Sequence, residues 1–447
     1  SAYYNPKSID LITPLNYNDD LDKISECDWV IEVIAERLDW KIDLYKKIRP
    51  FLKSDAIVTS NTSGISISAL IEGMDGDMAS NFFITHFFNP PRYMKLVEVI
   101  LSSVTNKEIV PVVVNCLEGV LGKGVVYAKD TPNFIANRIG VYGMMATLEE
   151  ARKRKISIED VDLLTGSLIG RPKSATFRTA DVVGLDTMCF VANTAYENCI
   201  NDSERDIFKI PEYLKSMVDN GWVGQKSGQG FYKKIDKGVI HSLDLETLEY
   251  SEQKKKRYSA VRLAKENINL VDRLSALIST DDVAGDFVWA LTARALIYSA
   301  NRIGEVSDDI LNIDRAMKWG FGWELGPFEI WDALGFVDTL ERMVSSGYTV
   351  PKSILKLKNS GFTSFYKRVK GVVSYLDIES EKYIAIKKSD KEISFNDYSH
   401  NNGLIEKHWS ASIVDLGDGV AGVNLHSVLQ AQLNPIDGSV LQTLFKA

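Results

Sequence analysis

The feature that most constrains the fold is a change of pattern near Pro132. Before it, short apolar runs alternate with segments whose apolar residues have helical spacing. The runs expected to form strands are Asp28–Ala35, Ala56–Ser60, Asn81–His86, Lys95–Leu101 and Gly124–Ala128, and the expected helices are Glu36–Arg49 and Lys107–Leu121. Strands that alternate with helices indicate a parallel, doubly wound α/β sheet. After Pro132 long helical segments take over, so we expect an α/β part followed by an all-α part.

The helical half contains an internal repeat. The sequence ANRIG at Ala136–Gly140 recurs at Ala300–Gly304, and the segment Gly166–Thr187 after the first copy is similar to Lys318–Thr339 after the second. The order of elements is the same at an offset of roughly 150–165 residues, which is typical of a duplicated unit. We therefore expect two related helical units that pack side by side; chance similarity between amphipathic helices is the alternative.

The pattern changes again in the C-terminal part. After Tyr366 the chain is polar and irregular, and from Ala411 two strand-like halves surround Gly417–Gly419, a good hairpin signal. A hairpin and the short helical run Ser439–Ala447 bury too little to fold alone, so they are expected to open another domain. The expected division is 1–128 for the α/β part, 129–235 and 285–372 for the helical units, 236–284 and 373–410 for linkers, and 411–447 for the last domain.

Composition excludes several classes of protein. The net charge of −8, from 52 basic and 60 acidic residues, argues against a general nucleic-acid binder, which needs a basic face. There is no apolar run long enough to span a membrane, and residues 1–20 lack the pattern of a secretion signal. The four cysteines lie far apart, which favours reduced thiols over disulfides or zinc. A cytoplasmic location is expected.

The sharpest local motif is Thr85–Val99 (THFFNPPRYMKLVEV). His86 ends one apolar run and Glu98 lies within the next; in a hairpin centred near Arg92 the two residues face one another. A carboxylate behind an imidazole sets its tautomer and raises its basicity, which prepares a general base. A structural His–Glu pair that bridges two strands is the alternative.

Two further segments offer polar groups. Ser60–Ile65 follows a predicted parallel strand, where loops line the ligand crevice of an open α/β sheet. The alternative is that Ser63 caps the following helix. Asn137 lies early in a helix at the junction of sheet and helices, from which it can reach a cleft. Capping by Asp130 or Thr131 explains part of that segment, but not Asn137.

Two searches give negative results. A GxGxxG motif does not follow a strand near the amino terminus, where a dinucleotide-binding fold places one. The glycine-rich segment Gly224–Gly230 follows helices and precedes Phe231, so it is not a phosphate loop of that type. The remaining histidines lack the spacing of metal ligands, and no metal is expected.

Together these motifs resemble the L-3-hydroxyacyl-CoA dehydrogenase family of fatty-acid β-oxidation. The resemblance rests on VIEVIAERLDWK (30–41), SNTSGISI (60–67), THFFNPPRYMKLVEV (85–99), KDTPNFIANRI (129–139) and GWVGQKSGQGFY (221–232). The doubled helical part and the hairpin ASIVDLGDGVAGVNLHS resemble the fused subclass, in which an enoyl-CoA hydratase domain follows the dehydrogenase. The implied fold is a partial Rossmann-type sheet, two tandem helical domains of the dehydrogenase C-terminal type and the start of a crotonase-like domain.

The resemblance also implies roles for single residues. His86 is implied to be the general base and Glu98 its orienting partner, with Ser63 and Asn137 on the substrate oxygen and thioester region. The residues implied to lie along the nicotinamide–ribose side of NAD are Glu36, Lys41, Asn61 and Asn89, with Lys226 as a further candidate. The implied reaction is oxidation of an L-3-hydroxyacyl-CoA to the 3-ketoacyl-CoA.

Compared with the family, the sequence starts after the first βαβ unit and stops near the beginning of the hydratase domain. We therefore expect the sequence to be truncated at both ends, and we expect it to have no hydratase activity. The implied partners are an acyl-CoA substrate and either a second copy or a thiolase. The alternative function is a catalytically incomplete fragment that only binds acyl-CoA or serves assembly. Another nicotinamide enzyme for a short hydroxy acid is disfavoured by the helical repeat and the hydratase-like tail.

Overall fold

The computed structural model describes residues 5–236, 238–254, 256–369, 372–387, 395–399, 403–427 and 434–447. Parts of the expected linkers and of the expected last domain lie outside these ranges. The chain divides into two compact units, 1–360 and 361–447. All four cysteines are free thiols, as expected. Within the described ranges, each helix is too short or too polar to cross a bilayer.

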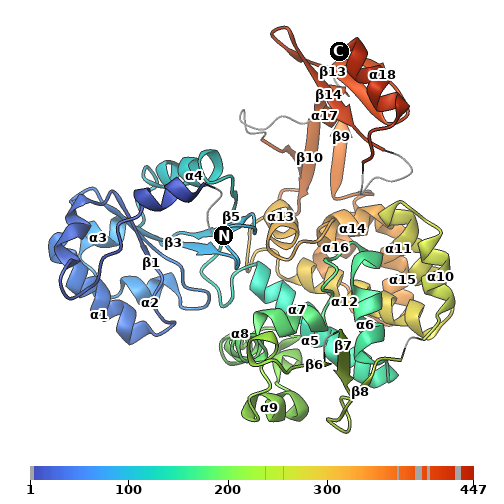
Figure 1. Ribbon diagram of the computed structural model, residues 1–447, viewed down its shortest axis with the longest axis horizontal. Helices are drawn as coiled ribbons and strands as arrows, with labels where there is room; N and C mark the ends of the chain where they lie inside the picture. The colour runs from blue at the N-terminus through green and yellow to red at the C-terminus, as the bar shows by residue number, and fades with distance from the viewer. Residues whose placement is uncertain are drawn as a thin grey trace. The chain divides into compact units, whose positions relative to one another are not determined.

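The first unit begins with a five-stranded sheet in the order β1-β2-β3-β4-β5. The strands are β1 (Trp29–Glu32), β2 (Ile57–Ser60), β3 (Phe82–Phe87), β4 (Leu96–Ile100) and β5 (Gly124–Ala128), all at predicted positions. The helices are α1 (Leu38–Ile48), α2 (Ile67–Ile71), α3 (Gly76–Ser80) and α4 (Val110–Gly119). Figure 1 shows α4 on the opposite face of the sheet from α1 and α2. The core is formed by apolar strand residues that pack against both helical layers.

The parallel sheet indicated by the alternation of strands and helices is interrupted at one pair, where the predicted hairpin forms. β1, β2 and β3 are parallel, but β3 and β4 pair antiparallel, and β5 runs parallel to β4. A parallel crossover needs about a dozen residues or more, and the connection through Asn89-Pro90-Pro91 is shorter than that. The chain therefore turns back beside β3, and the sheet is mixed.

The rest of the first unit is mainly helical. Its helices are α5 (Ala136–Arg154), α6 (Ile158–Thr165), α7 (Phe177–Val183), α8 (Leu185–Asn198), α9 (Glu212–Asp219), α10 (Ser259–Lys265), α11 (Leu270–Ser279), α12 (Val283–Asn301), α13 (Ile310–Gly320), α14 (Pro327–Ala333), α15 (Phe336–Ser345) and α16 (Lys352–Asn359). The strands β6 (Tyr232–Asp236), β7 (Val239–Leu243) and β8 (Tyr250–Glu252) form an antiparallel sheet. The segment 236–284, expected as a linker, thus contains two of these strands and two helices.

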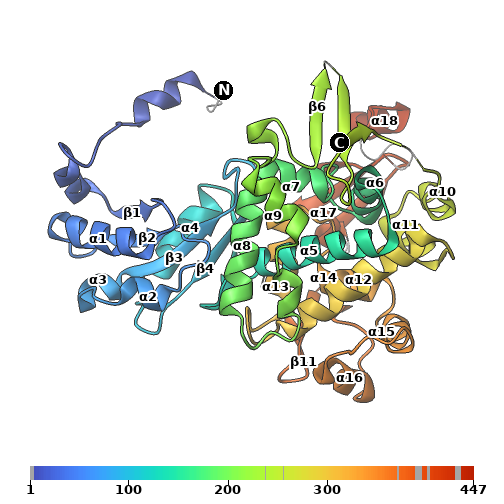
Figure 2. The same cartoon turned by 90° about the horizontal axis from the view of Figure 1, so that it is seen from below.

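The ANRIG identity does not mark equivalent positions of the internal repeat. The first copy lies at the start of α5, and the second lies at the end of α12 and in the turn after it. The similarity is therefore coincidental, although the helices that carry the two copies, α5 and α12, pack against each other. Figure 2 shows these two helices side by side at the centre of the helical part.

The later segments of the repeat are equivalent in structure. Asp162 in α6 accepts the backbone N–H of Phe177 at the start of α7 (2.7 Å), and Asp314 in α13 accepts that of Phe328 at the start of α14 (2.9 Å). The turns that follow α7 and α14 each place a glycine at positive φ, Gly184 at 101° and Gly335 at 87°. Two carboxylates and two turns in the same order support a duplicated helical unit, with α6–α8 corresponding to α13–α15.

α13 also packs on the sheet. The backbone N–H of Lys129, just after β5, donates to the carbonyl of Val306 (2.9 Å). A Cβ on Gly124 would lie 2.4 Å from the ring of Trp319, and one on Gly140 would lie 2.0 Å from the ring of Phe321. Both glycines are needed because an aromatic ring of the second helical copy occupies the space of their side chains.

The second unit, residues 361–447, holds two small antiparallel sheets. They are formed by β9 (Tyr366–Val369), β10 (Val372–Asp377) and β11 (Lys382–Ala385), and by β12 (Leu404–Lys407), β13 (Ala411–Gly417) and β14 (Val420–Leu425), with α17 (Phe395–Tyr398) and α18 (Gly438–Lys446) beside them. The predicted hairpin is confirmed as β13–β14. It contains a G-x-G-x-x-G pattern at Gly417–Gly422 that forms a turn and a strand, not a nucleotide loop. The segment 373–410, expected to be irregular, contains strands.

A buried ionic cluster joins α5 to α12. Asp202 accepts hydrogen bonds from Arg138 (2.6 Å) and from the hydroxyl of Tyr298 (2.7 Å), and Arg302 lies 3.1 Å away. The side chains of Arg138 and Asp202 are fully buried. Next to the cluster, the rings of Tyr142 and Tyr298 stack at 3.6 Å. A buried cation keeps its charge at low cost only while its partner is charged.

We expect Asp202→Asn to lower the free energy of unfolding by about 3–5 kcal/mol, because the buried Arg138 then loses its buried carboxylate partner and keeps only the more exposed Glu305. Urea unfolding followed by tryptophan fluorescence measures the effect. Asp206→Asn is the matched control, since its ion pair with Lys209 is largely exposed and is expected to change stability by less than about 1 kcal/mol. Equal effects of the two substitutions would contradict this account of the cluster.

Candidate functional site

The centre of the site is a pair of side chains that face each other across β3 and β4. His86 and Glu98 are register partners, as predicted, and Nδ1 of His86 lies 2.7 Å from Oε2 of Glu98. The two residues are 5% and 0% exposed. The hairpin thus places an imidazole and a carboxylate in contact inside the protein.

The second oxygen of Glu98 holds the start of α5. Oε1 accepts the backbone N–H groups of Ile135 (3.0 Å) and Ala136 (2.9 Å), which have no partner within the helix. With the contact to His86, the two oxygens of Glu98 thus have three hydrogen-bond partners. An ionised carboxylate only accepts, so this arrangement favours the neutral tautomer of His86 with the proton on Nδ1 and a lone pair on Nε2.

Aromatic rings surround the imidazole. The ring of Phe88 lies 4.7 Å from it in an edge arrangement, and that of Phe134 lies at 5.6 Å. The ring of Phe321, which follows α13, lies 6.5 Å from that of Phe88 and packs against it. These rings exclude water from one side of His86, which strengthens its interaction with Glu98.

The backbone before α5 is strained at two successive residues. Asn133 and Phe134 have φ of 65° and 50°, a region that bulky side chains rarely adopt. The amide of Asn133 donates to the carbonyl of Val191 in α8 (2.8 Å), which helps to hold this conformation. The turn presents Phe134 to His86 and delivers the two N–H groups to Glu98. Strain of this kind is typical of functional sites.

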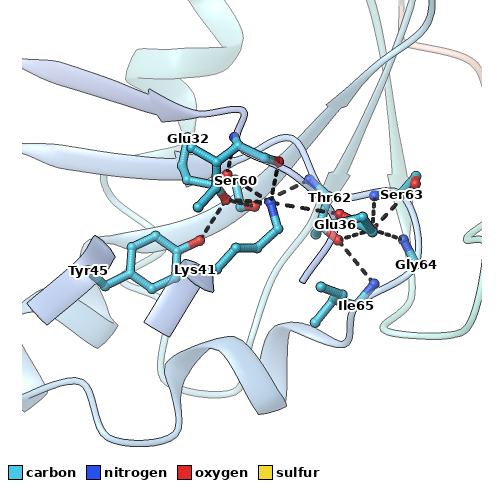
Figure 3. A network of polar contacts seen from close by, with 10 residues as sticks. Glu32, Glu36, Lys41, Tyr45, Ser60, Thr62, Ser63, Gly64 and Ile65 are labelled. Carbon is cyan, nitrogen blue, oxygen red and sulfur yellow. Dashed lines mark hydrogen bonds and ion pairs between the residues drawn. The ribbon is translucent and has the colours of Figure 1, made fainter. Parts of the chain in front are cut away.

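A second buried carboxylate lies at the end of β1 (Figure 3). Glu32 accepts from Lys41 (2.7 and 2.9 Å), from the hydroxyl of Tyr45 (2.9 Å) and from Ser60 (2.6 Å). Burial, together with the neighbouring Glu32, raises the pKa of Tyr45 above its ordinary value, so its hydroxyl stays a donor. This network joins β1, α1 and β2.

A third carboxylate holds the loop after β2. Glu36 accepts from the hydroxyl of Thr62 (2.6 Å) and from the backbone N–H groups of Ser63 and Gly64 (both 2.9 Å). Its other oxygen lies 3.7 Å from Lys41, and the side chain is 23% exposed. The helix after this loop, α2, is capped by Ser66, so the interpretation of Ser63 as its cap is wrong. Figure 3 shows Glu36 between Lys41 and the loop.

The sequence suggested Asp130 as a cap of α5, but the structure places its carboxylate elsewhere. Its carboxylate accepts from Ser66 (2.6 Å) and from the backbone N–H of Ile67 (2.9 Å), and so holds the start of α2. Glu98 supplies the corresponding interaction for α5. A Cβ on Gly64 would lie 3.3 Å from Thr194 of α8, which shows that the loop after β2 touches the helical part.

The structure brings most of the predicted site residues to this junction. Asn61 accepts the backbone N–H of Phe87 (2.8 Å) and so ties the end of β2 to the end of β3. Asn89 follows β3 and is exposed, and Asn137 is half-buried in the first turn of α5. Lys226 lies in the turn Gln225–Ser227, where it pairs with Asp186 (2.7 Å).

Sequence reasoning missed several residues of the site. They are Glu32, Tyr45, Phe88, Phe134 and Phe321. Glu32 had a signal, because a carboxylate inside the apolar run DWVIEVIA needs a buried partner. Phe321 had none, since more than two hundred residues separate it from β4 and only the packing of α13 brings it near.

Comparison with known proteins identifies the family. The chain matches the model of the 3-hydroxyacyl-CoA dehydrogenase NAD binding domain over residues 3–131, and that of the C-terminal domain over residues 134–234. It is 45% identical over 440 residues to a probable 3-hydroxyacyl-CoA dehydrogenase of Bacillus subtilis, which is 98% of this chain and 55% of that protein. It thus spans about half the length of that relative.

Two shorter proteins are covered more fully. A probable 3-hydroxybutyryl-CoA dehydrogenase of Deinococcus radiodurans is 32% identical over 49% of this chain and 76% of its own length. The crystal structure of 3-hydroxybutyryl-CoA dehydrogenase from Escherichia coli has a TM-score of 0.55 at 21% identity, over 76% of this chain and 84% of that one, which shows a likeness of fold. The resemblance seen in the motifs is thereby confirmed. The chain belongs to the 3-hydroxyacyl-CoA dehydrogenase family, with the NAD-binding domain followed by the helical C-terminal domain.

Proposed function

We propose that this chain carries the catalytic centre for NAD-dependent oxidation of an L-3-hydroxyacyl-CoA to the 3-ketoacyl-CoA in fatty-acid β-oxidation. The observation that carries the proposal is the buried His86–Glu98 pair, which leaves Nε2 of His86 as an acceptor. A base of this kind suits removal of a proton from a hydroxyl group near neutral pH.

His86 takes the hydroxyl proton at Nε2 as the C3–H bond of the substrate breaks. The imidazolium that forms keeps its Nδ1–H on Glu98, whose negative charge stabilises it at 2.7 Å. Bound NAD would supply the hydride acceptor for C3. Ser63 and Asn137 are proposed to hold the substrate oxygen and the thioester region from the loop after β2 and from the start of α5.

The residues present fit the nicotinamide–ribose end of NAD. Glu36 has a partly exposed carboxylate with one oxygen that makes no hydrogen bond among the described residues. Asn61 and Asn89 add amide groups at the ends of β2 and β3, the edge where open α/β sheets bind ligands. Lys41 is proposed to act through Glu36, since its ammonium is buried. In the part of the chain that the structure describes, this edge has no glycine-rich strand-to-helix turn for the diphosphate.

The same proposal includes two further domains and a partner in assembly. The equivalence of α6–α8 and α13–α15 supports a second domain of the dehydrogenase C-terminal type in residues 285–372. The hairpin β13–β14 is proposed to be the start of a crotonase-like domain, from its resemblance in sequence. A thiolase or a second copy is proposed as the partner in assembly, on the same resemblance.

We expect His86→Ala to lower kcat by about 10²- to 10⁴-fold, because the base is lost. Oxidation of NADH with acetoacetyl-CoA measures the reverse reaction. His241→Ala is the matched control, since His241 lies in β7, outside the site, and it is expected to leave kcat within about twofold of the parent. An active His86→Ala variant would contradict the role of His86. A folded parent chain without turnover would contradict the activity and favour a role in acyl-CoA binding or assembly.

Glu98→Gln tests the orienting carboxylate. We expect kcat to fall by about 100-fold or more with KM changed little, because an amide in place of the carboxylate no longer selects the tautomer with a free Nε2 and cannot stabilise the imidazolium. A loss confined to KM would instead assign Glu98 to substrate binding.

Phe321→Ala tests the contribution of the second helical copy. Removing this ring leaves Phe88 without support and lets the imidazole move, so we expect kcat to fall by up to about 100-fold. Phe321→Tyr, which keeps a ring, is expected to retain most of the activity. Phe51→Ala, in the α/β part and partly exposed, serves as the control. Unchanged kinetics of Phe321→Ala would show that α13 only supports folding.

A further inference from the structure

A second cavity lies in the first unit, away from His86. Its volume is about 780 Å³, and it is lined by α6, the segment before α7, the start of β6, and α10 with the segment that precedes it. The residues that surround His86 and Glu98 do not line it. Cavities of about 300–1,000 Å³ are the usual size of small-molecule sites.

The described residues of this cavity have a charge opposite to that of the whole chain. Six basic and three acidic side chains line it, whereas the protein carries a net charge of −8. The basic residues are Lys173, Arg178, Lys256, Arg257, Arg262 and Lys265. Such a concentration of like charge raises the local potential and favours anions.

The three acidic side chains already have partners within the protein. Glu159 accepts the backbone N–H of Lys254 (2.9 Å), and Asp160 accepts the hydroxyl of Tyr258 (2.9 Å). Asp162 accepts the hydroxyl of Tyr232 (2.8 Å) as well as three backbone N–H groups at the start of α7. Burial raises the pKa of Asp162 to about 6, so the carboxyl remains mostly ionised at neutral pH and its charge is offset by these donors.

Most of the basic side chains have no such partner. Lys173, Lys256 and Arg257 are exposed and form no ion pair with any described residue, and the same is true of Lys265. The guanidinium of Arg178 lies over the ring of Tyr232 at 4.5 Å. Cations held close together without counter-charges repel one another, so an anion that binds among them is favoured.

We propose that this cavity binds a phosphorylated, nucleotide-sized anion. Arginine and lysine groups are the usual phosphate ligands of proteins. An uncharged base would find apolar walls in this cavity, formed by Leu163, Val261 and the rings of Tyr232 and Tyr258. The hydroxyl groups of both tyrosines are already hydrogen-bonded to carboxylates. Two kinds of ligand carry both the phosphate groups and the base: a free adenine nucleotide, and coenzyme A with its phosphorylated ADP part.

The test is isothermal titration of the full chain with ADP, coenzyme A and 3′-dephospho-coenzyme A. The variant is Lys256→Glu with Arg257→Glu, which reverses two exposed charges of the cavity. The matched control is Lys107→Glu with Lys215→Glu, two exposed lysines outside the cavity that change the net charge of the chain by the same amount. Thermal melting of each variant confirms that it is folded.

We expect saturable binding of at least one of these compounds to the parent chain, weakened about tenfold or more in the cavity variant and less than about twofold in the control. Preference for coenzyme A over the dephospho form identifies the coenzyme as the source, and tightest binding of ADP identifies a free nucleotide. No saturable binding at about 1 mM ligand, or the same affinity in the cavity variant as in the control, overturns the proposal. Because the readout is binding, the result does not depend on dehydrogenase activity.

Discussion

The site depends above all on the carboxylate of Glu98. It is fully buried, and an isolated charge there would cost several kcal/mol. Three hydrogen-bond partners offset this desolvation free energy: two backbone N–H groups at the start of α5 and the imidazole of His86. The same group therefore performs two tasks, since it attaches the helical part to the sheet and sets the tautomer of the imidazole. Neither task can be changed without the other, because the donors share one carboxylate.

The other carboxylates at the strand ends show how environment decides role. Glu32 is enclosed by Lys41, Tyr45 and Ser60 and serves as an internal brace. Glu36 binds the backbone of the loop after β2 through one oxygen and remains partly exposed. The two residues are four positions apart in the sequence. Only the number of donors around each, and the access of solvent, separates a structural group from a candidate cofactor group.

The two helical segments 129–235 and 285–359 contribute to the site in different ways. The first segment provides Asn137 and the strained turn that faces His86. The second segment supplies Phe321, which fills the space over Gly140 and supports the aromatic wall. The cluster around Asp202 joins the long helices α5 and α12. A second segment that lacks the polar site residues can thus still affect the site, through packing alone.

The sequence by itself determined the features that depend on near neighbours. The five strands, the hairpin that pairs His86 with Glu98, and the β13–β14 turn follow from periodicity and turn residues, which act over a few positions. Only the tertiary structure decided the true register of the repeat, the capping of α5 by Glu98, the pairing of Lys226 with Asp186 and the place of Phe321. These depend on contacts between distant segments, whose energies come from burial and from paired charges that no local pattern encodes.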